Sequence, residues 1–231
     1  MESAIGLGLV WYAMFLFSTT CHEAAHAWTA MKLGDPTAKE GGQASLDPLP
    51  HIRREPLGMV VFPVVTFFLT GWTVGWASAP YDPFWADRHP RRAALMALAG
   101  PAANLLLILA AGIVLRIGLD TGGFHLPARL AFERVAVGTE GGPAGAAATL
   151  ASVMFSLNLI LFLFNLMPLA PLDGTALWAL VLPERAGRAL LTRLRDPAVQ
   201  MLALIALWTG FRFILAPVYA GALLLLYRGL H

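Results

Sequence analysis

Three neighbouring side chains near the start of the sequence have the types and the spacing of a hydrolytic metal site. The run from His22 to His26 reads His-Glu-Ala-Ala-His, so on a helix its two imidazoles project from one face, one turn apart, and can reach the same ion. Glu23 lies close enough to contact a water on that ion without ligating it. Zinc lowers the pKa of its water to about 7, and a nearby carboxylate can take up the proton. The pattern predicts His22 and His26 as metal ligands and Glu23 as general base.

The segment around this motif is apolar. Hydrophobic residues make up 58% of the chain and charged residues only 13%, against about 25% charged in a typical soluble domain. Burying two histidines and a glutamate in a spanning helix costs several kcal/mol unless they have a ligand to hold. This setting favours a metal site over a chance triplet. The net charge is only +2, and the basic residues are scattered among apolar segments. Both observations argue against a nucleic-acid partner.

Five apolar stretches approach or exceed the roughly 20 residues that a helix needs to cross a bilayer. We therefore expect an all-α polytopic membrane protein. The chain is predicted to form a single domain, 1–231, with a catalytic core at about 4–182 and a C-terminal helical segment at about 198–228. The last stretch is long for one crossing and short for two. The stretches cover about residues 4–33, 57–77, 92–119, 149–167 and 198–227.

The basic residues predict how the chain is oriented, because short cytoplasmic loops collect Lys and Arg. They gather in the connectors after the first, second and fourth stretches, whereas the loop at 121–145 holds only Arg129 and Arg134. The three basic connectors are thus expected in the cytoplasm, and the N-terminus outside. Both ends of the stretch at 57–77 then lie on the same side, so we expect it to double back as a short helix followed by an extended return.

A catalytic zinc also needs a third protein ligand. The candidate is Asp173, in the segment from Asn165 to Gly174, where two prolines interrupt the helix. Its other interpretation is an N-cap for a helix at about 175–182. The orientation favours the ligand, because the first and fourth stretches both run inward and bring Asp173 to the depth of His22. A metal site near the cytoplasmic side of the membrane follows.

With these two segments, the chain resembles the site-2 protease family of intramembrane zinc metalloproteases. The two signatures of that family, HExxH and an NxxPxxPLDG-like segment, stand at residues 22–26 and 165–174. The segments at 34–39, 46–51 and 99–104 are also similar to the compact bacterial members.

The resemblance implies one zinc per chain, held by His22, His26 and Asp173, with Glu23 as the base. It also implies a re-entrant hairpin near Thr37 to His51 that offers a strand edge to an unwound substrate.

The activity that this resemblance implies is that of a zinc metalloendopeptidase, cleaving bonds within or next to transmembrane segments in regulated intramembrane proteolysis. Its partners would be transmembrane protein substrates and the lipid bilayer, in a multi-pass protein of the cell membrane. Two alternatives are a catalytically silent membrane binding protein of the same fold and a metal-dependent membrane lipid oxygenase. A diiron oxygenase needs several histidine clusters, whereas the other four histidines are scattered, at His51, His89, His125 and His231.

Two asparagines are further candidates for the site. Asn165 and Asn104 each have two interpretations: a hydrogen bond to the substrate or to the developing oxyanion, or a contact between helices.

Overall fold

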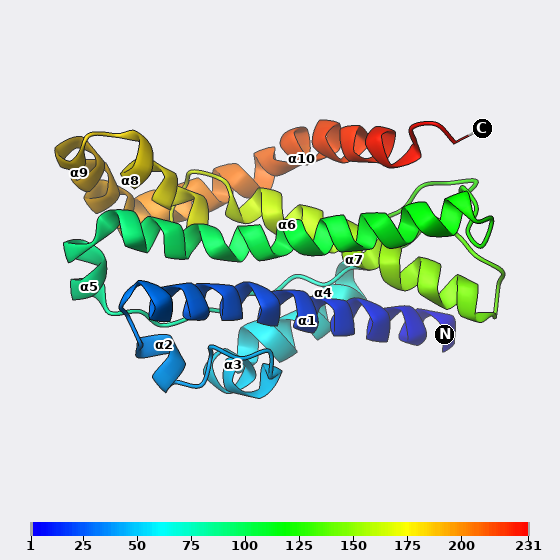
Figure 1. The fold of residues 1–231 in the computed structure, drawn as a ribbon, viewed down its shortest axis with the longest axis horizontal. Coiled ribbons are helices and arrows are strands. Elements are labelled where there is room, and N and C mark those ends of the chain that lie inside the picture. The colour runs from blue at the N-terminus through cyan, green and yellow to red at the C-terminus, as the bar shows by residue number, and fades with distance from the viewer. Residues whose placement is uncertain (1, 231) are drawn as a thin grey trace.

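The structure is a computed structural model that describes residues 2–230, and within these residues it contains helices and no strand (Figure 1). Four helices are long and apolar enough to cross a membrane. The expected all-α polytopic membrane fold is confirmed. These helices are α1 (Glu2–Leu33), α6 (Pro90–Asp120), α7 (Pro143–Asn165) and α10 (Pro197–Tyr227).

Three of the long helices begin with a proline at the first helical position, where its missing N–H would be unpaired in any case. The last of them, α10, is also capped by Asp196, which accepts a hydrogen bond of 2.8 Å from the N–H of Ala198. The stretch that looked long for one crossing is thus a single helix, and Pro217 lies inside it without ending it.

The long helices run alternately up and down (Figure 1). Helix α6 packs along both α1 and α7, and the two chain termini lie at the same end of the molecule as the loop between α6 and α7. The opposite end carries the short helices α5 (Pro83–Arg88), α8 (Leu177–Val181) and α9 (Glu184–Leu194). The alternation agrees with the relative directions expected for the crossings, and which end faces the cytoplasm stays a prediction.

The segment after residue 56 doubles back as expected. A π-helical turn (η1, Leu57–Val61) leads into α4 (Phe62–Thr70), which ends at Gly71 in the left-handed conformation, φ 83°. The chain then returns in extended form. The N–H of Trp76 reaches the carbonyl of Gly58 at 3.2 Å, so the return lies against the turn that precedes α4.

The residues before this segment differ from the expectation. The strand edge implied near Thr37 to His51 is wrong, because the chain there forms α2 (Thr37–Glu40) and α3 (Pro48–Arg54). The physical reason is local: Asp47 accepts a hydrogen bond of 2.9 Å from the N–H of Leu49, and a proline follows it, which together start a helix.

Asp35 fastens this end of the bundle. Its carboxylate accepts hydrogen bonds from the N–H groups of Thr37 at 3.0 Å and of Asp82 at 2.9 Å, and from the Thr37 hydroxyl. Burial alone would raise the pKa of Asp35, but the hydrogen bonds outweigh it and hold the pKa below its ordinary value. The carboxylate thereby ties the end of α1 to the start of α5.

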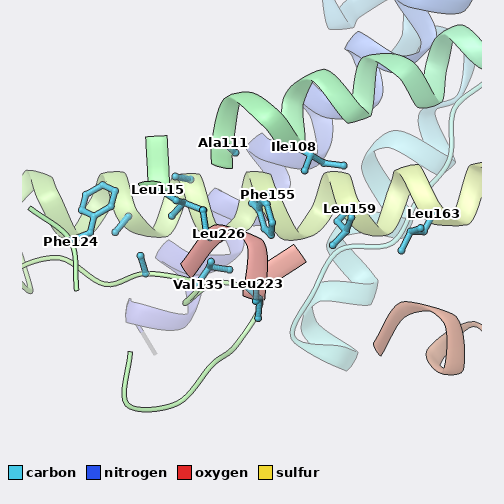
Figure 2. Close-up of a cluster of buried hydrophobic side chains, with 13 residues drawn as sticks. Ile108, Ala111, Leu115, Phe124, Val135, Phe155, Leu159, Leu163, Leu223 and Leu226 are labelled. Atoms are coloured by element: carbon cyan, nitrogen blue, oxygen red, sulfur yellow. The ribbon is translucent and has the colours of Figure 1, made fainter. Parts of the chain in front are cut away.

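The largest apolar cluster lies between α6, α7 and the C-terminal part of α10 (Figure 2). Polar contacts also fasten the end of α10: the Tyr227 hydroxyl donates to the carbonyl of Val135, in the loop between α6 and α7, at 2.6 Å, and Arg116 of α6 donates to the Leu226 carbonyl at 3.1 Å. The first half of α10 is largely exposed. Buried members of the cluster include Ile108, Leu115, Phe155, Leu159, Leu223 and Leu226.

Candidate metal centre

The two histidines of α1 face each other in the interior. Their Nε2 atoms lie 3.0 Å apart, and both side chains are buried. Each Nδ1 atom faces an oxygen acceptor: the side-chain oxygen of Asn104 lies 2.6 Å from His22, and the carbonyl oxygen of Met96 lies 2.8 Å from His26. An acceptor at Nδ1 favours the proton there, and in a neutral ring with that proton the Nε2 lone pair is free to bind a metal.

Asp173 joins the pair from the other end of the sequence. Its Oδ2 atom lies 3.0 Å from Nε2 of His22 and 3.3 Å from Nε2 of His26. It begins a short 3₁₀ helix, η2 (Asp173–Ala176), whose N-cap residue is Leu172, and its carboxylate contacts the two histidines rather than a backbone N–H. The N-cap interpretation therefore has no support in the geometry, and the interpretation as a ligand does.

The turn that presents Asp173 is held at two points. The indole N–H of Trp178 donates to the carbonyl of Pro168 at 2.9 Å. A Cβ added at Gly174 would collide with the carbonyl of Leu166, at the end of α7, so only glycine allows this close approach. Together these contacts turn the chain sharply after α7 and point the aspartate back at α1.

The three converging atoms fit a metal ion. They are all acceptors and lie 3.0, 3.0 and 3.3 Å apart, close to the roughly 3.3 Å between ligand atoms of a tetrahedral ion with bonds of about 2 Å. Without a metal ion or a proton between them, their lone pairs would repel. A Cβ at Gly100 of α6 would lie against both Nε2 atoms, so the glycine leaves the space that an ion needs. Two histidines and one carboxylate are a donor set of catalytic zinc, with one position open.

Glu23 lies beside this cluster. Its side-chain oxygen and the nitrogens of the two histidines fall within 4.8 Å of one another. The residue is only 5% exposed, and its carboxylate has no hydrogen-bond or ion-pair partner among the side chains that the structure describes, those of residues 4–230. A buried carboxylate without a protein partner is available to a water molecule at the ion.

The two candidate asparagines occupy different places. Asn104 is fully buried, and both ends of its amide are engaged, by His22 and by Asn158. It is thus placed to orient a ligand, and no part of it faces a substrate. Asn165 is partly exposed at the end of α7, where one N–H donates to the Leu161 carbonyl at 3.0 Å. This hydrogen bond does not use the amide oxygen or the second N–H of Asn165, and the expected contact of Asn165 with a substrate stays a prediction.

Three neighbours of the site did not figure among the expected site residues: Met96, Gly100 and Asn158. Met96 acts through its backbone carbonyl, so its residue type gives no indication of this role. Asn158 is an amide in the middle of a spanning helix, and that placement was a usable signal.

Comparison with known proteins identifies the family. The model of peptidase family M50 matches residues 10–209, which is most of the chain. The chain belongs to peptidase family M50. The resemblance to the site-2 proteases is thereby confirmed, and all four residues of the cluster lie within the matched part of this M50 chain.

Two relatives of this M50 chain carry names that describe a metalloprotease. It is 35% identical over 160 residues to "Putative zinc metalloprotease YwhC" of Bacillus subtilis (strain 168), which covers 69% of this chain and 63% of that protein. It is 32% identical over 130 residues to "Putative zinc metalloprotease Rip2" of Mycolicibacterium smegmatis, covering 56% and 46%. The chain thus spans less than two thirds of the length of each. No solved structure matches it.

Proposed function

We propose that this chain is a zinc metalloendopeptidase that cleaves peptide bonds within or next to transmembrane segments of membrane protein substrates. The observation that carries the proposal is the convergence of two Nε2 atoms and one carboxylate oxygen, 3.0 to 3.3 Å apart, inside the bundle of spanning helices. The unpartnered carboxylate of Glu23 beside them supplies the base that hydrolysis requires. Membership of a peptidase family supports the same activity.

Each residue of the cluster has a distinct role in this proposal. His22, His26 and Asp173 hold one zinc ion, which when bound polarises the scissile carbonyl and makes water acidic enough to be deprotonated near neutral pH. Glu23 accepts the proton of the attacking water at its carboxylate and later delivers it to the nitrogen of the leaving amine. The buried setting strengthens these charge interactions, since the local dielectric is low.

The location of the site restricts the substrate. A substrate helix hides its carbonyls in its own hydrogen bonds, so it must unwind locally before water can attack. We therefore expect residues that weaken helices, such as glycine and proline, near the scissile bond. The basic residues at the end carrying α5 and α9 support a site near the cytoplasmic face of the cell membrane.

The experiment that tests the proposal is cleavage of single-span substrates by the purified protein, together with its metal content. Glu23→Gln keeps the size of the side chain but removes the base, so it should retain one zinc per chain and lose cleavage by about 1,000-fold or more. Glu140→Gln is the matched control and should cleave like wild type, because Glu140 is an exposed acidic residue of the loop between α6 and α7. A chelator should abolish cleavage, and added zinc should restore it.

Other outcomes point to other functions. Full activity of Glu23→Gln would refute the assigned base. Iron in place of zinc would favour a lipid oxygenase, and a protein without bound metal or cleavage would be a silent binding protein of the same fold.

A further inference from the structure

The two histidines are oriented by different means. Nδ1 of His26 faces a backbone carbonyl, that of Met96, at 2.8 Å. Nδ1 of His22 faces the side chain of Asn104 at 2.6 Å. A carbonyl only accepts, whereas an amide side chain can turn either its oxygen or its NH₂ group toward a neighbour. Something beyond Asn104 must therefore decide which end it offers to His22.

Asn158 of α7 makes that decision. Its Nδ2 atom donates to the backbone carbonyl of Met154 at 2.8 Å and to the hydroxyl of Ser18 at 2.9 Å. Because the carbonyl cannot donate, the oxygen of Asn158 must face the other way, toward Asn104. Asn104 in turn must donate its NH₂ group to Asn158, at 2.8 Å, and present its oxygen to His22.

We propose that Asn158 and Asn104 form a directional hydrogen-bond relay, from the Met154 carbonyl to His22, that fixes the Nδ1–H tautomer and so keeps the Nε2 lone pair at the metal position. Both asparagines are positioning residues, and neither touches the ion or the substrate. The relay deepens the proposed zinc site and rests on it.

The surroundings make the relay rigid. Asn104, Asn158 and Ser18 are each 0% exposed, so water cannot replace a missing partner. Ser18 also contacts the sulfur of Met154 at 3.5 Å. The relay joins α1, α6 and α7, and each of these three helices contributes at least one member. Breaking any link leaves a buried polar group without a partner.

The test compares wild type with Asn104→Leu and Asn158→Ala. The matched control is Ser152→Ala, since Ser152 is also fully buried in α7 and receives hydrogen bonds from the N–H groups of Val135 and Ala136 at 3.1 and 3.2 Å, away from the relay. The first readout is the zinc dissociation constant, measured by competition with a chelator. Loss of a group that orients a ligand weakens metal binding about 10- to 100-fold. We expect this for Asn104→Leu, about 10-fold for Asn158→Ala, and no change for the control.

The second readout is the tautomer of His22 in the zinc-free protein. The ¹⁵N spectrum of histidine-labelled protein distinguishes Nδ1–H from Nε2–H, and the His22 signal is assigned by its loss in His22→Ala. The spectra are recorded at a pH where the ring is neutral and in an Asp173→Ala background, which removes the carboxylate 3.0 Å from Nε2 of His22. With the relay intact, and with Ser152→Ala, His22 should show Nδ1–H alone, and with Asn158→Ala a mixture. If Asn158 served only in helix packing, Asn158→Ala would lower the stability of the protein but would leave the His22 tautomer unchanged.

The relay is overturned if Asn158→Ala retains both the Nδ1–H signal and wild-type zinc affinity. Because the tautomer is read without zinc, a wild-type protein that binds no zinc would contradict the proposed function, and the spectra would still decide the relay. If Asn158→Ala does not fold, Ser18→Ala removes one partner of the same amide. It should then give a smaller shift in the same direction, and an unchanged tautomer and affinity would overturn the relay.

Discussion

The two histidines and the aspartate belong to regions that are built differently. His22 and His26 lie in the middle of a packed pair of long helices, with side chains 8% and 9% exposed. Asp173 lies on a turn between α7 and α8 and is 23% exposed, and the helices that follow it, α8 and α9, have few buried side chains. The comparison teaches that two of the three candidate ligands are positioned by the packed bundle, whereas the third is presented by a less buried turn.

The strongest way to break the preformed part is to fill the space between the histidines. In Gly100→Ala the added Cβ would press against both Nε2 atoms, so zinc affinity should fall more than about 100-fold, beyond the usual effect of a change outside the ligands. The matched control is Gly112→Ala in the same helix, where a Cβ would meet Phe155 at an ordinary 3.7 Å. Chelator competition measures both. Equal affinities in the two variants would show that the space at Gly100 does not hold the ion.

Zinc removal should separate the two regions. Without the ion, the turn keeps its internal hydrogen bond from Trp178 to Pro168 but loses its link to the histidines through the ion, while α1 and α6 keep their packing. Amide hydrogen exchange in residues 166–176 should therefore rise on chelation by a factor of 10 or more, on the order of the loss of one ligand contact. Exchange in residues 15–30 should change much less. An equal rise in both parts would mean that the bundle, too, depends on the ion.

A weaker change loosens the turn alone. Trp178→Phe keeps the ring but removes the hydrogen bond to Pro168, a loss of about 1 kcal/mol. Since the turn must be ordered before Asp173 can bind the ion, zinc affinity should fall about fivefold. Trp208→Phe, at an exposed position of α10, serves as control. A wild-type affinity for Trp178→Phe would mean that the ion orders the turn unaided.

The smallest effect on the metal is expected at Asp35, which fastens α1 without approaching the cluster. Asp35→Asn should lower stability by about 2 kcal/mol, because the hydrogen bonds go to a charged group, and should leave zinc affinity unchanged. Since the pKa of Asp35 lies below its ordinary value, its contribution is present at neutral pH and is lost as the pH falls below about 3.9. Thermal unfolding should thus show wild type and variant converging in acid; a gap that is constant with pH would contradict the role of the charge.

The difference between the histidines, which share one helix, and the aspartate, which lies on a distant turn, also explains which features could be predicted from the sequence. The HExxH pair was accessible because it needs only the geometry of one helix, and the doubling back at 57–77 followed from the charges on either side of it. The strand edge predicted near Thr37 was wrong because it rested only on the resemblance to a family. The local sequence, with Asp47 as N-cap and Pro48 at the first helical position, starts a helix instead. The relay through Asn158 was missed because it depends on which faces of α1, α6 and α7 meet, and that register is a tertiary property.

Helix length adds a dependence on the lipid. At 1.5 Å per residue, the 23 residues of α7 span about 34 Å, close to the hydrocarbon thickness of about 30 Å. The 32 residues of α1 span about 48 Å, so α1 must tilt or protrude. Because α1 carries the histidines and α7 leads to the aspartate, a thicker or thinner bilayer would change the depth of the zinc relative to a substrate helix. For the proposed protease activity, hydrophobic mismatch would then decide which bond of a substrate is presented for cleavage.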